Sequence, residues 1–230
     1  MSRPDVLKFA GARSSFEYME HYLKKISLVK RQREIIVGTL LGDGHLETQT
    51  NGKTYRLKIL HAASQKEYLD WLYLELQTIS AHPPRHKIIK ACGKEYSNYW
   101  FDTVSSPSFR FYAQQFYEAK RKQVPKFINK LLTPLGLAVW YMDDGSIKSH
   151  ETRGRILNTQ GFSKPDVLRL IECLSKRFGI LTAPRKQPEG WQIFIPAEMY
   201  EKLVQTIGHY VIPSMRYKLF FPSHHKKTLD

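Results

Sequence analysis

The chain has 230 residues, with 36 Lys and Arg against 21 Asp and Glu, so its formal net charge is +15. A hydrophobic content of 42% with 13% aromatic residues excludes a disordered protein and suits one large domain or two smaller ones. The excess of positive charge predicts a polyanionic partner, with nucleic acid favoured.

Two cysteines, Cys92 and Cys173, are too few for a disulfide framework or a thiolate zinc site, and they fit a reducing compartment. No apolar run approaches the roughly 20 residues that span a bilayer, and the basic N-terminal segment has no signal-peptide core. These features predict an intracellular protein, and they do not distinguish a mitochondrion, a plastid or a bacterial cytoplasm.

The first half of the chain predicts three helices and two hairpins. An apolar helix ends before Asp43, and the Asn51-Gly52 pair is a hairpin signal between the first two strands. Ser64, with Glu67 three residues later, resembles a capping box that opens the second helix. The predicted helices are 33–42, 64–77 and a third that starts near residue 111 and stops before the extended Val124-Pro125 step. The predicted strands are 45–50, 54–62, 86–91 and 97–103.

The second half repeats this order. Asp144 follows Asp43 by 101 residues, Ser163 with Asp166 matches the first Ser-initiated helix, and Pro213 aligns with Pro125 without gaps. The predicted helices are 135–143, 163–176 and a third that starts near residue 199 and stops before the extended Ile212-Pro213 step. The predicted strands are 146–150, 154–160, 182–187 and 191–195.

Matched elements in the same order indicate an internal repeat. Helices mixed with antiparallel strands, without βαβ alternation, predict an α+β fold. We divide the chain into an N-terminal extension, two related halves and a basic C-terminal tail, with bounds 1–26, 27–128, 129–222 and 223–230.

The predicted strands carry basic and amide residues on one face, as in residues 54–60, where Arg56 and Lys58 oppose Leu57 and Ile59. Such a face is either a solvated surface or a reader of base edges, since a major groove admits a two-stranded ribbon. The predicted DNA-binding residues, with two that follow the Asp-Gly pairs, are His45, Arg56, Lys58, Arg85, Lys87, Lys90, Asn98, Ser146, Lys148, Arg153, Arg155, Asn158, Arg185, Lys186 and Gln192.

Glycines on the first apolar helix predict a close helix pair. Gly38 and Gly42 are four residues apart, so they share a face and let another backbone approach. Packing this helix against its repeat would bring Asp43 and Asp144 together, where two carboxylates at helix C-termini repel. A lone Asp-Gly pair is also a plain helix stop, but two matched copies favour a site for divalent cations such as Mg²⁺, which act on phosphodiesters.

The segments IVGTLLGDG (36–44) and LAVWYMDDG (137–145) resemble the two motif copies of a single-chain LAGLIDADG homing endonuclease. The likeness also covers ILNTQGFS (156–163) and YVIPSMRYKL (210–219), and is strongest to the yeast mitochondrial intron-encoded type. The chain departs from the motif at Val139, which replaces the first glycine and predicts an asymmetric helix interface.

The resemblance implies two αββαββα halves around a pseudo-twofold axis, with the motif helices central and the sheets forming a saddle over DNA. It implies that Asp43 and Asp144 are essential Mg²⁺ ligands, with Mn²⁺ or Ca²⁺ able to substitute in binding. The carbonyls of Gly42 and Asp143 would add ligands, and the Asp143 side chain is not expected to be a principal one.

The same resemblance implies that Lys122 and Lys218 are active-site residues that stabilise the phosphorane or orient water; otherwise they are phosphate contacts or surface charge. The gapless repeat alignment places Tyr210, not Lys218, opposite Lys122, which leaves their equivalence open.

We therefore expect a monomer that cuts both strands of a long, asymmetric DNA target, leaves 3′ overhangs and serves intron homing. An RNA-binding intron maturase on the same fold is the alternative, with RNA as its partner. A DNA-binding regulator without activity is less favoured because both acids are present.

Overall fold

The computed structural model describes residues 26–149 and 151–220. The predicted N-terminal extension, apart from its last residue, and the predicted C-terminal tail lie outside these residues, and the proposed domain bounds remain predictions. Within the described part, no helix combines the length and the apolar composition needed to cross a membrane.

The first half follows the predicted order of helix, hairpin, helix, hairpin and helix. Its four strands form one sheet in the order β1-β2-β4-β3, with antiparallel neighbours. The elements are α2 (Lys30–Leu41), β1 (His45–Glu47), β2 (Arg56–Ala62), α3 (Lys66–Leu76), β3 (Arg85–Ala91), β4 (Lys94–Asp102) and α4 (Arg110–Phe116).

The second half repeats this plan after the short helix α5 (Ile128–Leu131). Its sheet has the matching order β7-β8-β10-β9, again antiparallel. The elements are α6 (Pro134–Asp144), β7 (Gly145–Ser149), β8 (Thr152–Leu157), α7 (Lys164–Phe178), β9 (Ala183–Gln187), β10 (Gly190–Ile195), α8 (Tyr200–Ile207) and α9 (Arg216–Leu219). The predicted α+β fold of two αββαββα halves is confirmed.

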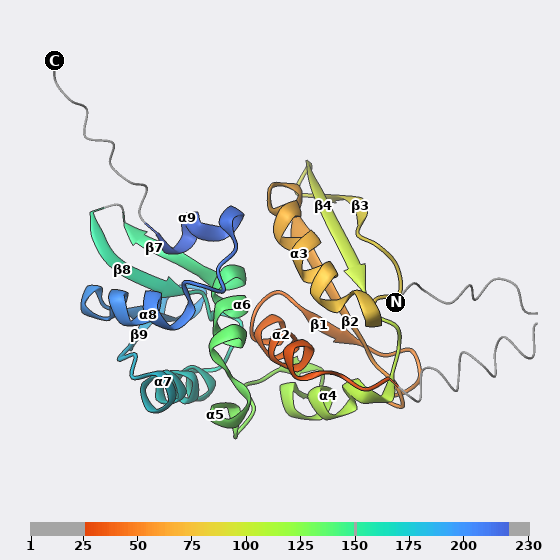
Figure 1. Ribbon diagram of the computed structural model, residues 1–230, viewed down its shortest axis with the longest axis horizontal. Coiled ribbons are helices and arrows are strands. Elements are labelled where there is room, and N and C mark those ends of the chain that lie inside the picture. The colour runs from red at the N-terminus through yellow and green to blue at the C-terminus, as the bar shows by residue number, and fades with distance from the viewer. Residues whose placement is uncertain (1–25, 150, 221–230) are drawn as a thin grey trace, which may run out of the picture.

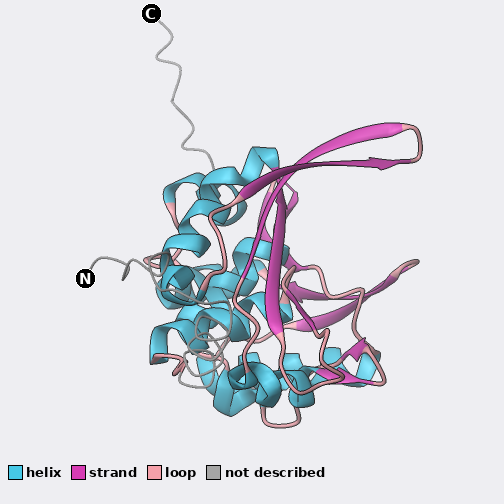
Figure 2. Cartoon of the chain, turned by 90° about the vertical axis from the view of Figure 1, so that its right-hand side faces the viewer, coloured by secondary structure: helices cyan, strands magenta, loops and turns pink. Residues whose placement is uncertain are grey.

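Helices cover one side of both sheets, and the other side is open (Figure 2). The period of two along β2 produces this division, because Leu57, Ile59 and His61 are buried while Arg56 and Lys58 are half-buried on the opposite face. In β10, Ile193 and Ile195 are buried in the same way. We call the side away from the helices the saddle face; it includes Arg56, Lys58 and Trp100 in the first sheet and Ile156, Gln192 and Phe194 in the second.

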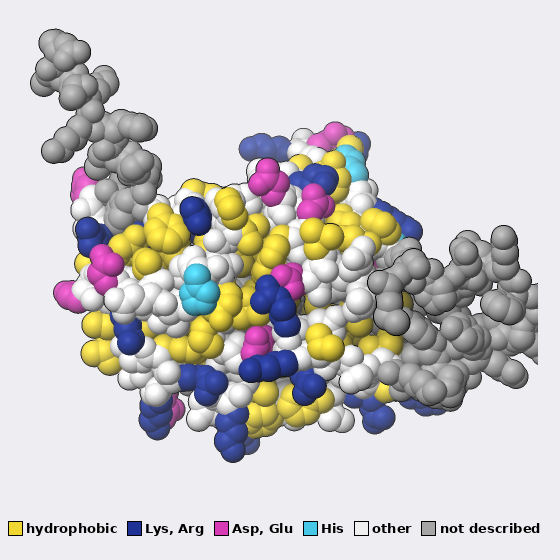
Figure 3. Space-filling view, viewed as in Figure 1, with side chains coloured by type: hydrophobic (Ala, Val, Ile, Leu, Met, Phe, Trp, Pro, Cys, Tyr) yellow, Lys and Arg dark blue, Asp and Glu magenta, His cyan; other side chains and the backbone are white. Residues whose placement is uncertain are grey.

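The helices α2 and α6 lie side by side at the centre, between the two sheets (Figure 1). Ile35, Ile36 and Leu40 of α2 and Leu137 and Trp140 of α6 are fully buried. Each such side chain contributes about 1.5–3 kcal/mol through burial, so this pair anchors the core that the two halves share. The helical side of the molecule carries charges of both signs among apolar patches (Figure 3).

Two local predictions in the first half are wrong. The helix predicted to run from residue 111 to the Val124-Pro125 step ends at Phe116, and a tight hairpin of β5 (Tyr117–Glu118) and β6 (Arg121–Lys122) follows. Ala119 and Lys120 have φ values of 46° and 69° in its turn, a left-handed conformation that ends a helix. Ser64 lies in a 3₁₀ turn before α3 and does not cap it. In the second half, Ser163 caps α7 as predicted, since its Oγ accepts the N–H of Asp166 at 3.3 Å.

Candidate active site at the ends of the central helices

The helices α2 and α6 approach most closely through Gly38 and Gly42. A Cβ atom on Gly38 would overlap the carbonyl oxygen of Gly136 and lie 2.7 Å from Cβ of Val139. A Cβ atom on Gly42 would overlap the carboxylate of Asp143. Each glycine of α2 therefore faces a larger residue of α6, which fits the asymmetric interface that Val139 predicted.

The two terminal acids lie at the converging ends of these helices. Asp144 is the last residue of α6, and Asp43 follows the C-cap residue Gly42 of α2. Burial raises the pKa of Asp144 to about 7, the nearby charge of Asp43 raises it too, and Lys122 and Lys218 partly offset both effects. The side chain of Asp43 stays 46% exposed. The expected repulsion between the two carboxylates is thus present.

The side chain of Asp143 belongs to the helix interface. Its Oδ2 accepts the backbone N–H of Asp43 at 3.0 Å, and its Oδ1 accepts the hydroxyl of Tyr68 at 2.8 Å. Burial, followed by the charges of Asp43 and Asp144, raises the pKa of Asp143 well above its usual range. The main structural role of the Asp143 side chain is therefore to fix the backbone of Asp43.

Each half supplies one lysine to the carbonyl group that precedes its terminal acid. Lys122 donates from Nζ to the carbonyl of Gly42 at 2.7 Å, and Lys218 donates to the carbonyls of Asp143 at 2.6 Å and Met142 at 2.5 Å. Gly42 and Asp143 hold the same position in the two motif copies. The two lysines are therefore spatially equivalent, although the repeat alignment does not match them.

Burial lowers the pKa of both lysines, and the neighbouring carboxylates of Asp43, Asp143 and Asp144 raise it. An ammonium group that is shielded from water interacts more strongly with charge placed beside it. Both groups are thus suited to act on an anionic substrate held between them.

His61 is a site residue that the sequence prediction missed. Its ring is buried on β2, with Nδ1 3.5 Å from Oδ2 of Asp43 and Nε2 3.6 Å from Oδ1 of Asp143. Burial lowers its pKa; Asp43 raises it and Lys218 lowers it further. The available signal was its alternation with Leu57 and Ile59, which places a polar residue in a buried series.

These residues fit a divalent cation. Ligand atoms of Asp43, His61 and Asp143 all lie within 4.8 Å of one another, and Nε2 of His61 is buried without a hydrogen-bond partner among the described residues. Burial and neighbouring negative charge raise the pKa of Asp143 and of Asp144, and a divalent cation bound beside these carboxylates would relieve their repulsion. The carbonyls of Gly42 and Asp143 already accept lysine N–H groups, but a carbonyl oxygen has a second lone pair.

Most predicted DNA-binding residues lie on the saddle face. Strand register places them there, because directly opposed residues of antiparallel strands point to the same side. Gln192, for example, donates its amide to Oδ1 of Asn158 at 2.8 Å. The residues on this face are His45, Arg56, Lys58, Arg85, Lys87, Ser146, Lys148, Asn158, Arg185 and Gln192.

Three predicted DNA-binding residues have side chains on the helical side of the sheet, away from the saddle face. Arg155 is fully buried, and its Nε and Nη2 donate to the carbonyl of Leu219 at 3.1 and 2.6 Å. Arg153 pairs with Glu201 of α8 at 2.7 Å. Lys186 lies opposite Trp191, whose ring is covered by Lys164 of α7.

Two further predicted DNA-binding residues, Asn98 and Lys90, have partners within the first sheet. Asn98 lies on the saddle face but is only 7% exposed, and its Nδ2 donates to the carbonyl of Tyr96 at 2.8 Å. Lys90 pairs with Glu95 at 2.8 Å on the side of β3 opposite to Lys87. Residue type alone cannot reveal such internal partners.

Comparison with known proteins gives the class to which this site belongs. The sequence model of the LAGLIDADG DNA endonuclease family matches residues 33–203. The chain therefore belongs to this family, and the resemblance inferred from its two motif copies is confirmed.

Individual relatives match this chain over most of its length and over most of their own. The chain is 30% identical over 210 residues to DNA endonuclease I-ChuI of Chlamydomonas applanata, covering 84% of this chain and 96% of that protein. It is 30% identical over 208 residues to cytochrome b mRNA maturase bI2 of Debaryomyces hansenii, covering 84% and 74%. The solved structure of the homing endonuclease I-WcaI bound to its DNA recognition sequence superposes with a TM-score of 0.85 at 24% identity, over 95% of this chain and 97% of that one.

Proposed function

We propose that this chain is a monomeric, site-specific homing endonuclease that hydrolyses one phosphodiester on each strand of a long, asymmetric DNA target. One observation carries the proposal: Asp43 and Asp144 converge at the ends of α2 and α6, and a lysine contacts the carbonyl before each of them. Family membership and the likeness to DNA endonuclease I-ChuI support it.

Divalent metal, with Mg²⁺ as the proposed cofactor and Mn²⁺ or Ca²⁺ able to replace it in binding, would polarise phosphoryl oxygens, lower the pKa of bound water and neutralise the leaving oxygen. Asp43 and Asp144 would hold it, and the carbonyls of Gly42 and Asp143 would add ligands. The imidazole of His61, which has a ligand atom within 4.8 Å of those of Asp43 and Asp143, would assist.

The residues of the chain would contribute charge and position. Lys122 and Lys218, aimed at the two matched carbonyls, would lie beside the scissile phosphates and stabilise the extra negative charge of each phosphorane. Asp143 would keep the backbone of Asp43 in place through its N–H bond. Each half would cut one strand, and the family pattern implies 3′ overhangs.

The saddle face would hold the duplex. Lysine and arginine contacts to phosphates would supply affinity that falls steeply with salt, and side chains on the four hairpins would read base edges. Relatives named as intron-encoded, such as the probable intron-encoded endonuclease 1 of Wickerhamomyces canadensis, support a role in intron homing inside the cell.

Cleavage of a randomised DNA library in Mg²⁺ tests the proposal. Wild-type protein should cut a small subset of sequences on both strands, while Asp43→Asn and Asp144→Asn should not, and EDTA should abolish cutting. Glu172→Gln is the matched control, because Glu172 is an exposed acid that pairs with Lys176 on α7. A wild type that binds the library but never cuts it contradicts the proposal.

An RNA maturase is the second candidate, favoured by the likeness to cytochrome b mRNA maturases. Splicing of a host intron by the Asp43→Asn, Asp144→Asn double variant would separate the activities. Splicing without cleavage would establish a maturase role independent of the acids.

A further inference from the structure

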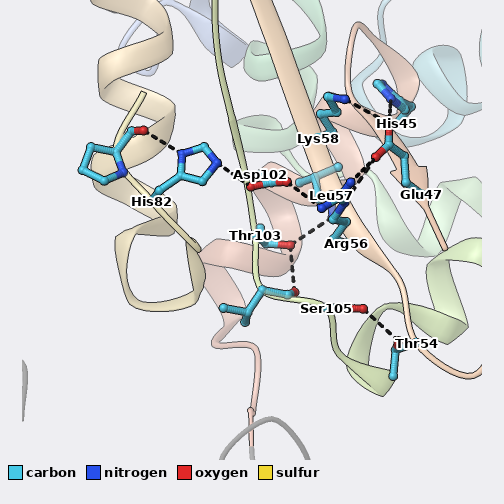
Figure 4. A network of polar contacts seen from close by, with 12 residues as sticks. His45, Glu47, Thr54, Arg56, Leu57, Lys58, His82, Asp102, Thr103 and Ser105 are labelled. Atoms are coloured by element: carbon cyan, nitrogen blue, oxygen red, sulfur yellow. Dashed lines mark hydrogen bonds and ion pairs between the residues drawn. The ribbon is translucent and has the colours of Figure 1, made fainter. Parts of the chain in front are cut away.

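A network of ion pairs joins three strands on the saddle face of the first sheet (Figure 4). Arg56 of β2 lies between two carboxylates. Its Nε and Nη2 donate to Oε2 of Glu47 at 3.2 and 2.9 Å, and its Nη1 lies 3.1 Å from Oδ2 of Asp102. The guanidinium is therefore held in one orientation by β1 and β4 together.

The two carboxylates are themselves held. Nε2 of His82 lies 2.8 Å from the second oxygen of Asp102, whose side chain is only 6% exposed. Burial raises the pKa of Glu47, but hydrogen bonds from His45, Arg56 and Lys58 outweigh that effect and lower it to about 2. Glu47 thus stays ionised, and Arg56 keeps a charged partner on each side.

This network does not suit a phosphate contact. Glu47 and Asp102 balance the charges of Arg56 and Lys58, so the group adds little to the positive field of a chain with net charge +15. A guanidinium has five N–H donors in a rigid fork, and the contacts to Glu47 and Asp102 engage three of them, one on each nitrogen, which leaves one on each Nη. A fixed arginine with donors to spare matches the N7 and O6 acceptors of guanine, the commonest specific contact in a major groove.

The same sheet positions differ in the second half. Counting from each Asp-Gly pair and following strand register, Glu47, Arg56 and Asp102 correspond to Lys148, Gly154 and Phe194.

There the network is replaced by an aromatic ring. Nζ of Lys148 lies 4.8 Å from the ring centre of Phe194. A Cβ on Gly154 would meet the ring at 3.1 Å, so glycine makes room for it. A half-buried aromatic ring on this face suits an apolar contact such as the thymine methyl group.

We propose that Arg56, positioned by Glu47 and Asp102, determines specificity for one guanine in the first half-site, while Phe194 reads a thymine methyl at the matching place in the second. The proposal rests on the DNA cleavage proposed above. Glu47 is four residues from Asp43, about 13 Å of extended chain, so the guanine lies roughly four base-pair steps from the cut.

The experiment profiles cleavage of the target recovered from the randomised library, together with every single base-pair variant of it. Wild type should reject substitutions of the guanine by about 10- to 100-fold. Arg56→Lys keeps the charge but lacks the fork, so it should lose this discrimination and leave the rest of the profile intact. Glu47→Gln and Asp102→Asn should relax the same base pair while keeping cleavage of the best target within a few fold.

Phe194→Leu is the matched variant in the other half, and it should relax only the thymine position. Thermal unfolding of each variant shows whether the sheet is intact. If Glu47→Gln or Asp102→Asn unfolds, Arg56→Lys still tests the proposal, because it alters a partly exposed side chain. If Arg56→Lys leaves the profile unchanged, or weakens all targets equally, the specificity proposal is wrong. A wild type that cuts no library member overturns the cleavage function as well.

Discussion

The two halves have the same lysine-to-carbonyl contact at the ends of the central helices, but different elements supply the lysine. Lys122 arrives at the carbonyl of Gly42 from a β-hairpin, whereas Lys218 arrives at that of Asp143 from the short helix α9. The acid, the carbonyl and the ammonium group recur in both halves while the supporting elements differ. Such a pattern is expected where a site needs the position of an atom and not a particular element.

The surroundings of the two acids are unequal. Asp43 has the buried His61 beside it and Asp143 bonded to its N–H, while Asp144 lies deeper, with its own carbonyl bonded to Asn158. The duplication therefore produced two related sites with different electrostatics, and substitutions in one half should not copy those in the other.

Substitution of Lys122 or Lys218 should have the largest effect, and it tests whether the two lysines are equivalent. Lys122→Met and Lys218→Met should each lower the single-turnover cleavage rate by roughly 100- to 1000-fold, as for loss of one group that stabilises a transition-state charge. Gel analysis of both labelled strands should show nicked DNA, because each lysine serves one strand. Lys176→Met, on the exposed part of α7, is the control. If either lysine proves silent, the two are not equivalent.

Asp144 tests the electrostatic difference. Its carboxyl has a pKa near 3.8 when unperturbed and about 7 in the folded chain, so the folded state binds the proton more tightly. Stability of the metal-free protein therefore falls as pH rises between these values, and the full penalty is present above about pH 7.

Asp144→Asn should remove that penalty and raise the free energy of unfolding at pH 8 by roughly 4 kcal/mol. Urea unfolding in EDTA measures this, and the gain should vanish below about pH 4. Asp43→Asn, at a more exposed carboxyl, should gain less. Equal stability of Asp144→Asn and wild type at pH 8 would contradict an energetic penalty for the buried Asp144 carboxylate beside Asp43.

Substitution of Gly38 tests the close packing of a small residue of α2 against the larger Val139 of α6. Gly38→Ala should cost about 3 kcal/mol, because the new Cβ overlaps the backbone of Gly136 and the side chain of Val139. Gly161→Ala is the matched control, since its Cβ would have no neighbour within 4 Å.

Adding Val139→Gly to Gly38→Ala should recover only part of the loss, because the carbonyl of Gly136 cannot move aside like a side chain. Thermal unfolding of the single and double variants forms a double-mutant cycle. Full additivity would show that these residues do not interact.

Substitution of Arg155 should give the smallest effect on stability. It distinguishes an arginine of the core from one on the saddle face. Arg155→Met should destabilise the fold by about 2 kcal/mol through loss of charged hydrogen bonds to the Leu219 carbonyl, with the salt dependence of DNA binding unchanged. Arg185→Met, on the saddle face, should leave stability alone and lower the salt slope by about one if it meets a phosphate. The reverse outcome would place Arg155 on the DNA.

Residue patterns predicted much of this molecule. The repeat, the central helices, the four hairpins and the two terminal acids could be found because each has a local cause: helical spacing of apolar residues, turn chemistry at Asn51-Gly52, and a carboxylate beside glycine. The strand bounds agree within a few residues. The helix after residue 111 was too long because the left-handed turn at Ala119 and Lys120 has no glycine to mark it.

By itself, the sequence determined which segments fold and which acids meet, since those depend on neighbours along the chain. Only the tertiary structure decided that Lys122 and Lys218 hold matching carbonyls, that His61 lies between Asp43 and Asp143, and that Arg155 bonds the Leu219 carbonyl in the core. The reason is physical, because distance in space sets the partner of a charged side chain. The carbonyl that Lys122 contacts is 80 residues away along the chain, and the carbonyl that Arg155 contacts is 64 residues away.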